Sequence, residues 1–326
     1  MRNFTKWTIV LIGFFIFLST SSAFAYNNAR WRVWVNDLRT DAIAEGIDPY
    51  LFDQIFHDMT PSQKHLHFDK TQPEHRLTYY EYRNTRSSKN RIRVGRKMYQ
   101  RHKFLLNEIG SRYGVNPCII VSLWGLETAY GNYMGDFNVI RSLATLAYDS
   151  RRGAFFRKEL LLALHMVNDG HVELKDFIGE WAGASGQSQF LPSSWYKYAV
   201  DYDGDGRKDI WQTYPDIFAS IANYLYQNGW EHGQPVLAEV TLPANFDSHL
   251  MGYKTKKTVA EWEHIGVRIK GGQPQPRADA TASIIHPYGG PTWMVFNNFL
   301  VLLSWNYSRY YAGTVNYLAM NVCRGE

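Results

Sequence analysis

One glutamate is placed where a helix could present it as an acid. Asn116 and Pro117 have the residue types of a helix start: a side-chain cap, then a proline whose missing N–H costs nothing at the first helical position. Apolar residues then recur at helical spacing, and Glu127 takes the next place on the same stripe, before Gly131 as the expected helix stop. The predicted stripe consists of Ile120, Leu123, Trp124 and Glu127.

A carboxylate on an apolar stripe suits general acid catalysis. Burying a carboxylate costs free energy unless it is paired or protonated, and desolvation raises a carboxyl pKa toward the range of a general acid. Two structural interpretations compete with this one: the side chain could end the helix at the surface, or it could pair with an arginine inside. The stripe alone does not separate these alternatives.

A second group of carboxylates has the spacing of a calcium loop. Residues 201–209 match the first part of an EF-hand loop, with carboxylates at positions 1, 3, 5 and 9 and Gly206 at position 6, where the chain turns sharply. Position 12 is Gln212 instead of the bidentate glutamate. The alternative is an Asp/Gly turn without an ion. We predict structural Ca²⁺, with ligands within the loop from Asp201, Asp203, Asp205, Arg207 and Asp209.

These residues need a mainly helical scaffold. Over residues 26 to about 232, apolar side chains recur mostly at helical spacing. Between about 235 and 285 the pattern changes to short β-branched segments, such as residues 236–240 and 267–269, separated by glycines and prolines. Helical spacing returns from Phe296. We therefore predict a mainly α fold (α+β) with a small β-rich part.

The first residues have the layout of a secretory signal peptide. Arg2 and Lys6 precede a short apolar run, and small residues end at Ala25. The run is short for a membrane span, which needs about 20 residues, so we expect cleavage near Tyr26 and no stable membrane anchor. The alternative is an uncleaved anchor helix. No cysteine lies near that point to accept a lipid.

Charge and cysteine content narrow the classes of partner. Without Arg2 and Lys6, 33 basic and 30 acidic side chains remain, a mild positive excess that suits a polyanionic wall or a membrane surface. The sequence has no dense Lys/Arg tract of the kind that indicates nucleic-acid binding. Aromatic residues make up 16% of the chain and can stack on sugar rings.

Export permits a disulfide between Cys118 and Cys323, but Cys118 stands in an apolar run that favours a buried free thiol.

Three longer motifs follow one another along the chain. They read LWGLETAYGNYMG around Glu127, then SLATLAYDSRR, then WAGASGQSQFLPSSWYKYAVDYDGDGRKDIW through the acidic loop. Together they resemble the lytic murein transglycosylase B family, over residues from about 76 to 311. The resemblance implies a lysozyme-like catalytic core with an added α-helical domain and a small β domain. It also implies cleavage of the β-1,4 bond between N-acetylmuramic acid (MurNAc) and N-acetylglucosamine (GlcNAc), with a 1,6-anhydro product, Glu127 as acid and then base, and no organic cofactor.

The resemblance further implies residues that line a cleft around Glu127. Asp216 is implied as the closing ligand of the acidic loop. Arg151 and Arg152 correspond to a basic pair that could bind stem-peptide carboxylates or could end a helix in solvent. The implied substrate-binding residues are Tyr82, Arg151, Arg152, Glu180, Gln189, Phe190, Tyr224, Asn306 and Tyr311.

Two positions depart from the family pattern. Trp305 stands where the family more commonly has tyrosine. The tryptophan keeps an aromatic face for stacking but lacks the hydroxyl of tyrosine. Glu180 stands in place of a serine that is expected to hydrogen-bond the catalytic carboxylate. We expect Glu180 either to lie close to Glu127, where like charges perturb each other's pKa, or to point away, with water in the place of the serine. A second acid would also favour hydrolysis by an activated water.

The expected organisation has five segments, listed here with their roles: 1–25, signal peptide; 26–75, the N-terminal part of the α domain; 76–232, the catalytic core with the calcium loop 201–216; 233–285, the β-rich domain; 286–326, a C-terminal segment that closes the cleft. The leading interpretation is a periplasmic lytic transglycosylase that acts on peptidoglycan strands, with secretion further out as an alternative location. A lysozyme-like muramidase and a non-catalytic wall-binding scaffold are the alternative functions. Other cell-wall enzymes are candidate partners.

Overall fold

The computed structural model describes residues 29–62, 64, 77–149, 151–273 and 275–323. The expected signal peptide, residues 1–25, lies outside the described residues. Within the ranges given, no helix is both long enough and apolar enough to cross a membrane.

The described residues form two compact units. The first combines residues up to Thr71 with Phe137–Gly183, and the second combines Gln72–Asp136 with Ala184–Glu326. Residues 137–183 therefore group with the N-terminal helices and not with the rest of the range 76–232. The segment boundaries given by the sequence otherwise remain a prediction.

The first unit is helical, with one two-stranded ladder. α8 packs against α9, and β1 pairs antiparallel with β2 so that Phe137 lies opposite Gly179. The elements of this unit are a helix over residues 29–44, α2 (Pro49–Phe56), β1 (Phe137–Asn138), α8 (Val139–Asp149), α9 (Gly153–Asn168) and β2 (Ile178–Gly179).

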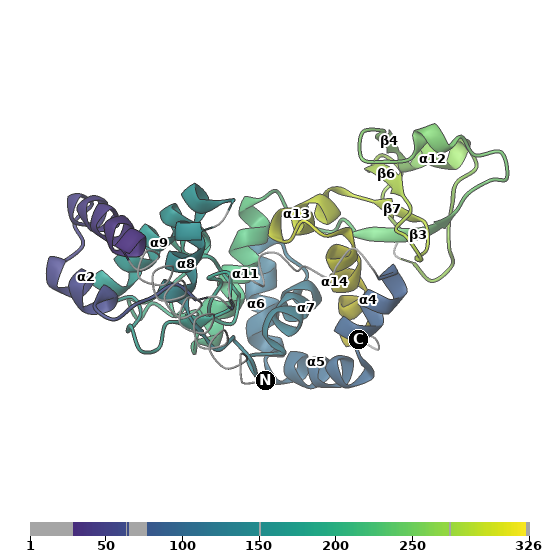
Figure 1. Ribbon diagram of the computed structural model, residues 1–326. Helices are drawn as coiled ribbons and strands as arrows, with labels where there is room; N and C mark the ends of the chain where they lie inside the picture. The colour runs from purple at the N-terminus through teal and green to yellow at the C-terminus, as the bar shows by residue number, and fades with distance from the viewer. Residues whose placement is uncertain (1–28, 63, 65–76, 150, 274, 324–326) are drawn as a thin grey trace, which may run out of the picture. The chain divides into compact units, whose positions relative to one another are not determined.

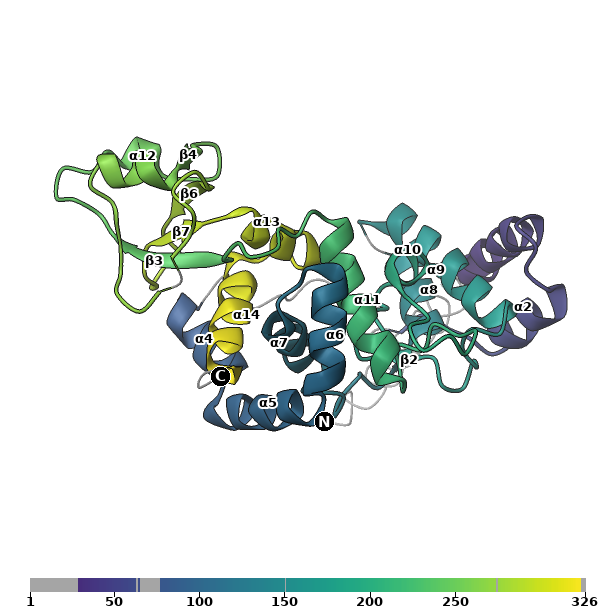
Figure 2. The ribbon, with the colours of Figure 1, turned by 180° about the vertical axis from the view of Figure 1, so that it is seen from behind.

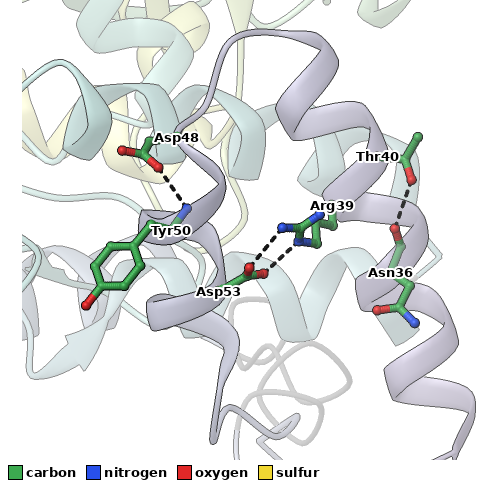
Figure 3. Close-up of polar contacts among 6 residues, drawn as sticks. All are labelled: Asn36, Arg39, Thr40, Asp48, Tyr50 and Asp53. Atoms are coloured by element: carbon green, nitrogen blue, oxygen red, sulfur yellow. Dashed lines mark hydrogen bonds and ion pairs between the residues drawn. The ribbon is translucent and has the colours of Figure 1, made fainter.

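Exposed polar contacts hold the N-terminal helices of this unit (Figure 3). Arg39 donates through Nε and Nη2 to the two carboxylate oxygens of Asp53 at 2.6 and 2.8 Å, which ties the helix over residues 29–44 to α2. The Asp48 side chain accepts the Tyr50 N–H at 2.7 Å and caps α2. Because the ion pair is solvent-exposed, it adds little to stability.

The second unit is built around α7 (Pro117–Thr128). Helices α5, α6, α11 and α14 pack against it, and Figures 1 and 2 show it enclosed among them. Every residue from Ile119 to Leu126 is buried, so burial extends well beyond the stripe that the spacing predicts. The helices of this unit outside the sheet are α4 (Tyr79–Arg86), α5 (Lys89–Arg101), α6 (Lys103–Tyr113), α7, α10 (Pro192–Tyr198), α11 (Tyr214–Gln227), α13 (Asn297–Trp305) and α14 (Arg309–Val322).

A small five-stranded sheet follows α11, in the order β4-β6-β7-β3-β5 with antiparallel neighbours. It has its own apolar core, in which Trp262 is fully buried and donates its indole N–H to the Ala282 carbonyl. The β-rich part is confirmed, but its last strand lies beyond residue 285, because a Pro/Gly turn returns the chain to pair with β3. The elements are β3 (Leu237–Thr241), the 3-10 helix η2 (Ser248–Leu250), β4 (Lys257–Thr258), α12 (Val259–His264), β5 (Arg268–Ile269), β6 (Thr281–Ile285) and β7 (Trp293–Val295).

The two cysteines form a disulfide, which corrects the expectation of a buried free thiol. Cys118 lies in the first turn of α7 and Cys323 is the C-cap of α14, and their Cα atoms are 6.1 Å apart. The apolar run around Cys118 correctly indicated burial of its surroundings. It carried no information about α14, which packs along α7 and brings the second cysteine to it.

Candidate active site

The start of α7 forms as the sequence predicts. Asn116 Oδ1 accepts the Cys118 N–H at 2.8 Å, and Pro117 occupies the first helical position. From this start the helix runs to Thr128, which places the half-buried Glu127 in the last turn.

The end of α7 corrects the expectation that Gly131 stops the helix. Ala129 (φ 50°) and Tyr130 (φ 64°) already adopt the left-handed conformation, which residues other than glycine rarely take. The Tyr130 side chain accounts for the early turn, because its hydroxyl donates to the Arg91 carbonyl at 2.9 Å and its ring packs edge-on against Trp124. Burial of this ring offsets the strain of the turn that directly follows the acid.

Two side chains from the C-terminal helices hold Glu127. Trp305 Nε1, at the end of α13, donates to Glu127 Oε1 at 2.8 Å. The Tyr311 hydroxyl, in the first turn of α14, donates a short hydrogen bond to the same oxygen. Sequence reasoning named Tyr311 as a cleft residue and identified Trp305 only as a departure from the family pattern. Although Trp305 lacks the hydroxyl of tyrosine, its indole N–H serves as a hydrogen-bond donor to Glu127.

Tyr311 is suited to remain a hydrogen-bond donor. Burial of its side chain, together with the nearby Glu127 charge, raises the Tyr311 pKa well above its ordinary value. Tyr82 and Arg86 also act on it electrostatically, and the Arg86 charge opposes the rise. The hydroxyl therefore keeps its proton throughout the range in which a carboxylate titrates.

An aromatic wall supports the Trp305 indole. The Tyr224 ring meets it edge-on with centroids 4.7 Å apart, and the Phe190 ring lies 5.5 Å away. The Tyr224 hydroxyl donates to the Ser304 carbonyl at 2.6 Å, and burial raises the Tyr224 pKa to about 12. Phe190 and Tyr224, both implied as cleft residues, are thus brought to the side chain that holds the acid.

The glycine-rich turn before α10 presents its two amides to different neighbours. Gln189 adopts a left-handed φ of 50°, and its Nε2 donates to the Gly186 carbonyl at 2.9 Å and to the Met134 carbonyl at 3.2 Å. Gln187 accepts the Trp124 indole N–H at 2.7 Å and donates to the Trp211 carbonyl at 2.8 Å. These contacts join the turn to α7 on one side and to the end of the acidic loop on the other.

Gln187 is a positioning residue that sequence reasoning missed. It is buried, and it gives Trp124 the acceptor that a buried indole N–H requires. A signal was present, because a tryptophan on a buried stripe needs an acceptor and the nearby turn carries two amides. The sequence could not show which of Gln187 and Gln189 reaches the helix.

The remaining predicted residues fall into two groups. In the second unit, Tyr82 is buried on α4 beside the Tyr310 ring, and Asn306 is the exposed C-cap of α13. The first unit holds Arg151, Arg152 and Glu180. Both arginines lie exposed in the turn before α9, while Glu180 is half-buried and its carbonyl accepts the Gly183 N–H. The role of this first-unit group at Glu127, including the expected coupling of Glu180 with Glu127, stays a prediction.

The acidic loop gathers its carboxylates as the spacing predicts. Carboxylate oxygens of Asp201, Asp203 and Asp205 all lie within 4.8 Å of one another. Local backbone donors shape the loop, because Asp201 accepts the N–H groups of Gly204 and Gly206 at 2.8 and 2.9 Å. Carboxylate oxygens this close together could bind a hard cation such as Ca²⁺, whose positive charge would offset their mutual repulsion.

Asp216 closes the loop from the first turn of α11. It is fully buried, and its two oxygens accept the N–H groups of Tyr202 and Asp209 at 2.7 and 2.8 Å. Asp209 in turn accepts the N–H groups of Trp211 and Gln212. Burial raises the Asp216 pKa, and the two backbone donors oppose that rise. Ligation of an ion by Arg207, Asp209 and Asp216 remains a prediction.

Solved structures of lytic transglycosylases share this fold and define the class of protein. SltB3 from Pseudomonas aeruginosa, in complex with NAG-anhNAM-pentapeptide, is 40% identical, with a TM-score of 0.85 over 90% of this chain and 80% of its own. The Escherichia coli lytic transglycosylase SLT35, in complex with calcium, is 28% identical, with a TM-score of 0.75 over 88% of this chain and 92% of its own. The lysozyme-like, mainly α architecture expected from the resemblance is thereby confirmed.

The chain belongs to the transglycosylase SLT domain family, whose model matches residues 30–320. Membrane-bound lytic murein transglycosylase B of Escherichia coli is 32% identical over 244 residues, which make up 73% of this chain. The chain spans 65% of the length of that relative.

Proposed function

We propose that this protein is a lytic transglycosylase that cleaves the MurNAc-β-1,4-GlcNAc bond of peptidoglycan and forms 1,6-anhydroMurNAc ends. The observation that carries the proposal is the Glu127 carboxyl group, held at the end of a buried helix by two donors on one oxygen. Its support is membership of the transglycosylase family and similarity to a solved relative that holds a NAG-anhNAM-pentapeptide.

In the first step, Glu127 transfers its proton to the glycosidic oxygen as the bond from that oxygen to C1 of MurNAc breaks. GlcNAc leaves with a free hydroxyl, and positive charge develops at C1, where the acetamido oxygen of the substrate meets it. In the second step, the C6 hydroxyl of the same MurNAc bonds to C1 and gives its proton back to the Glu127 carboxylate. The cycle consumes no water and returns the enzyme to its starting protonation state.

A single carboxyl group is sufficient for this chemistry. A hydrolase needs a second carboxylate for its nucleophile or its water, whereas here the nucleophile is part of the substrate and already lies near the reaction centre. The two donors on Glu127 Oε1 are neutral, because Trp305 carries no titratable group and the raised pKa keeps Tyr311 protonated. The residue therefore alternates between acid and base without a permanent ionic partner from either donor.

The sugar-binding residues of this proposal are those that the resemblance implies, and among them Tyr311 contacts Glu127 directly. Gln189, Phe190, Tyr224 and Asn306 supply amides and aromatic faces for the glycan, as does Tyr82 through its neighbour Tyr311. In the first unit, Arg151, Arg152 and Glu180 bind the stem peptide or the adjacent saccharide, and paired guanidinium groups suit peptide carboxylates.

The product of the wild-type protein tests the reaction type. Purified peptidoglycan is digested, and the released muropeptides are weighed by mass spectrometry. An anhydro end is lighter than a hydrolysed end by one water, so transglycosylation predicts the lighter series alone. A hydrolysed series would establish a muramidase instead.

The Glu127→Gln variant tests the acid. Glutamine keeps the shape and cannot deliver the proton, so we expect solubilisation to fall by about 10²- to 10⁴-fold while binding to insoluble peptidoglycan persists. An exposed glutamate in the sheet region, Glu263, offers a matched control, because Glu263→Gln should leave the rate unchanged. If Glu127→Gln solubilised peptidoglycan at the wild-type rate, Glu127 would not be the catalytic acid. If the wild-type protein bound peptidoglycan without solubilising it, the protein would be a scaffold.

We further propose that the acidic loop binds one structural Ca²⁺. Asp201, Asp203 and Asp205 would hold it, with Arg207 contributing its carbonyl oxygen and Asp209 and Asp216 closing the loop. A similar solved relative is in complex with calcium. The ion would rigidify the segment between α10 and α11, and through the hydrogen bond from Gln187 to Trp211 this segment supports α7.

Calorimetric titration with CaCl₂ tests the ion directly. After treatment with a chelator, the wild-type protein should bind one Ca²⁺ per chain with a raised melting temperature, because a ligand that binds only the folded state stabilises it. Asp203→Asn should weaken this binding, whereas Asp247→Asn, which retains the cap of η2, should not. Equal binding by both variants would place the ion at another site.

We also propose export to the periplasm. The pattern of residues 1–25 supports it, and so does the disulfide between Cys118 and Cys323, since disulfides persist in oxidising compartments. Cell fractionation and N-terminal sequencing test the proposal, with a mature chain that begins near Tyr26 as the expected result. A cytoplasmic protein that retains Met1 would contradict it.

A further inference from the structure

Trp305 contacts the carboxyl group of Glu127 through its indole N–H. Its Nε1 lies 2.8 Å from Glu127 Oε1, on which the Tyr311 hydroxyl also converges. We propose that Trp305 is a positioning residue that reserves Oε1 as an acceptor, so that Oε2 of Glu127 gives up and regains the proton. This inference rests on the proposed function, because it assigns the two oxygens within that reaction.

The chemistry of the indole separates the two oxygens. An indole N–H donates and cannot accept, whereas a protonated carboxyl oxygen presents an O–H that needs an acceptor. A proton on Oε1 would therefore face the N–H of Trp305 and leave that donor without a partner. Tyr311, buried and with a raised pKa, occupies a second lone pair of Oε1. Because the indole cannot reverse its role as a donor, Trp305 directs the transferable proton to Oε2.

The indole is held in place independently of substrate. The Tyr224 and Phe190 rings pack against it, and the Tyr224 hydroxyl bonds the carbonyl of Ser304, the residue before Trp305. Trp305 is the last residue of α13, so this bond anchors the helix end that carries it. A donor fixed in this way directs the carboxyl group before the substrate arrives, as preorganised catalytic groups require.

The Trp305→Phe variant removes the N–H and keeps an aromatic face. Because hydrogen bonds to a charged group are stronger than those between neutral groups, we expect kcat to fall by roughly 10- to 100-fold with KM nearly unchanged. Loss of a donor that favours the carboxylate should also move the alkaline limb of the kcat profile to higher pH. Among the described titratable or charged groups, Tyr311 contacts Glu127, Tyr82 and Arg86 act on Tyr311, and Tyr224 packs on Trp305 beside Tyr198; none of these side chains changes in the variant.

Tyr307→Phe is the matched control, since the Tyr307 side chain is 95% exposed just after α13. It should leave kcat, KM and the pH profile at wild-type values. For Trp305→Phe, a raised KM with unchanged kcat would make Trp305 a substrate contact. A lower kcat with an unmoved pH profile would make it a packing residue only. Either result overturns the inference.

A spectroscopic test needs no substrate and therefore separates this inference from the proposed reaction. In protein labelled with ¹⁵N-tryptophan, the indole signal absent from Trp305→Phe is that of Trp305. Its chemical shift should follow the titration of Glu127 and stop doing so in Glu127→Gln, while the Trp262 signal stays constant because its N–H bonds a backbone carbonyl. A Trp305 signal that ignores pH, or that titrates equally in Glu127→Gln, refutes the positioning role whatever product the enzyme releases.

Discussion

Two carboxylate sites of the second unit are built in opposite ways. Glu127 is held by side chains 178 and 184 residues further along the chain, on α13 and on α14, of which α14 packs against α7. Asp201, at the start of the acidic loop, is held by backbone N–H groups only three and five residues away. The first site exists only when distant helices are packed, whereas the second is shaped by its own segment.

The difference shows what each site can be used for. A group that donates and accepts a proton needs neutral, rigid donors and a partly buried position, and only packed tertiary structure supplies these. An ion site needs several oxygens on a short flexible turn, and a glycine-containing loop supplies those locally. Conditions that loosen the core should therefore disable the first site and leave the local shape of the second less affected.

Alkaline pH should lower the stability of the fold more than any other change considered, because it ionises tyrosines that are buried in the core around Glu127. Burial raises the pKa of Tyr79, Tyr130, Tyr224 and Tyr311 above the ordinary value of 10.0. A group whose folded pKa is raised contributes stability that is complete below its unfolded pKa and is lost as pH rises toward the folded value. We expect the urea midpoint to hold up to about pH 9 and to fall steeply between about pH 10 and 12.

Tyrosinate absorbance, followed beside circular dichroism, checks this prediction. The buried tyrosines should ionise together with the loss of helix signal. Ionisation of all tyrosines near pH 10 in a protein that keeps its native dichroism would show that the core around Glu127 is open to solvent.

Removal of the disulfide should have the next largest effect. Cys118 and Cys323 are 205 residues apart in sequence and join the start of α7 to the end of α14, the helices that carry Glu127 and Tyr311. We expect the double variant Cys118→Ser, Cys323→Ser to lose about 2–4 kcal/mol of unfolding free energy in urea. Reduced wild-type protein should match it, and a loss confined to the variant would indicate a packing defect of serine instead of a missing cross-link.

Gly206→Ala, in the acidic loop, should lower the unfolding free energy by about 1–2 kcal/mol, because L-residues are strained in the left-handed region. Gly206 has a φ of +90°, and nothing within 4 Å would meet the added Cβ, so the cost arises from the backbone alone. Gly271→Ala is the control, since that glycine has equal space and no left-handed φ. Chelator-treated proteins compared in urea check the prediction, and equal stability of the two variants would argue against a backbone requirement in the loop.

Ala129→Gly should have the smallest effect and the opposite sign. Ala129 adopts a φ of 50° at the C-cap of α7, where glycine carries no Cβ penalty. Relief of strain exceeds the extra entropy that glycine brings to the unfolded chain, which predicts a net gain of about 0.5 kcal/mol. A fall in unfolding free energy would show that the Ala129 methyl group makes packing contacts worth more than the strain.

Local features of both sites were accessible from the sequence because their physical causes are local. Asn116 and Pro117 start α7 through contacts within one turn, and the aspartates at 201, 203 and 205 cluster because a short loop brings them together. The end of α7 was not accessible. It depends on Tyr130, whose ring is buried against Trp124 and whose hydroxyl reaches back to the Arg91 carbonyl, so a tertiary contact overrides the stop that Gly131 would provide.

By itself, the sequence determined the mainly helical class, the β-rich insert, the family and Glu127 as the residue to examine. Periodicity, capping and motif order suffice for these, because each depends on the residue types and their spacing along the chain. Only the tertiary structure decided which groups touch Glu127, that Cys118 and Cys323 pair, and that Gln187 supports Trp124. Those contacts join residues that are distant in sequence, and their partners are selected by the packing of whole helices.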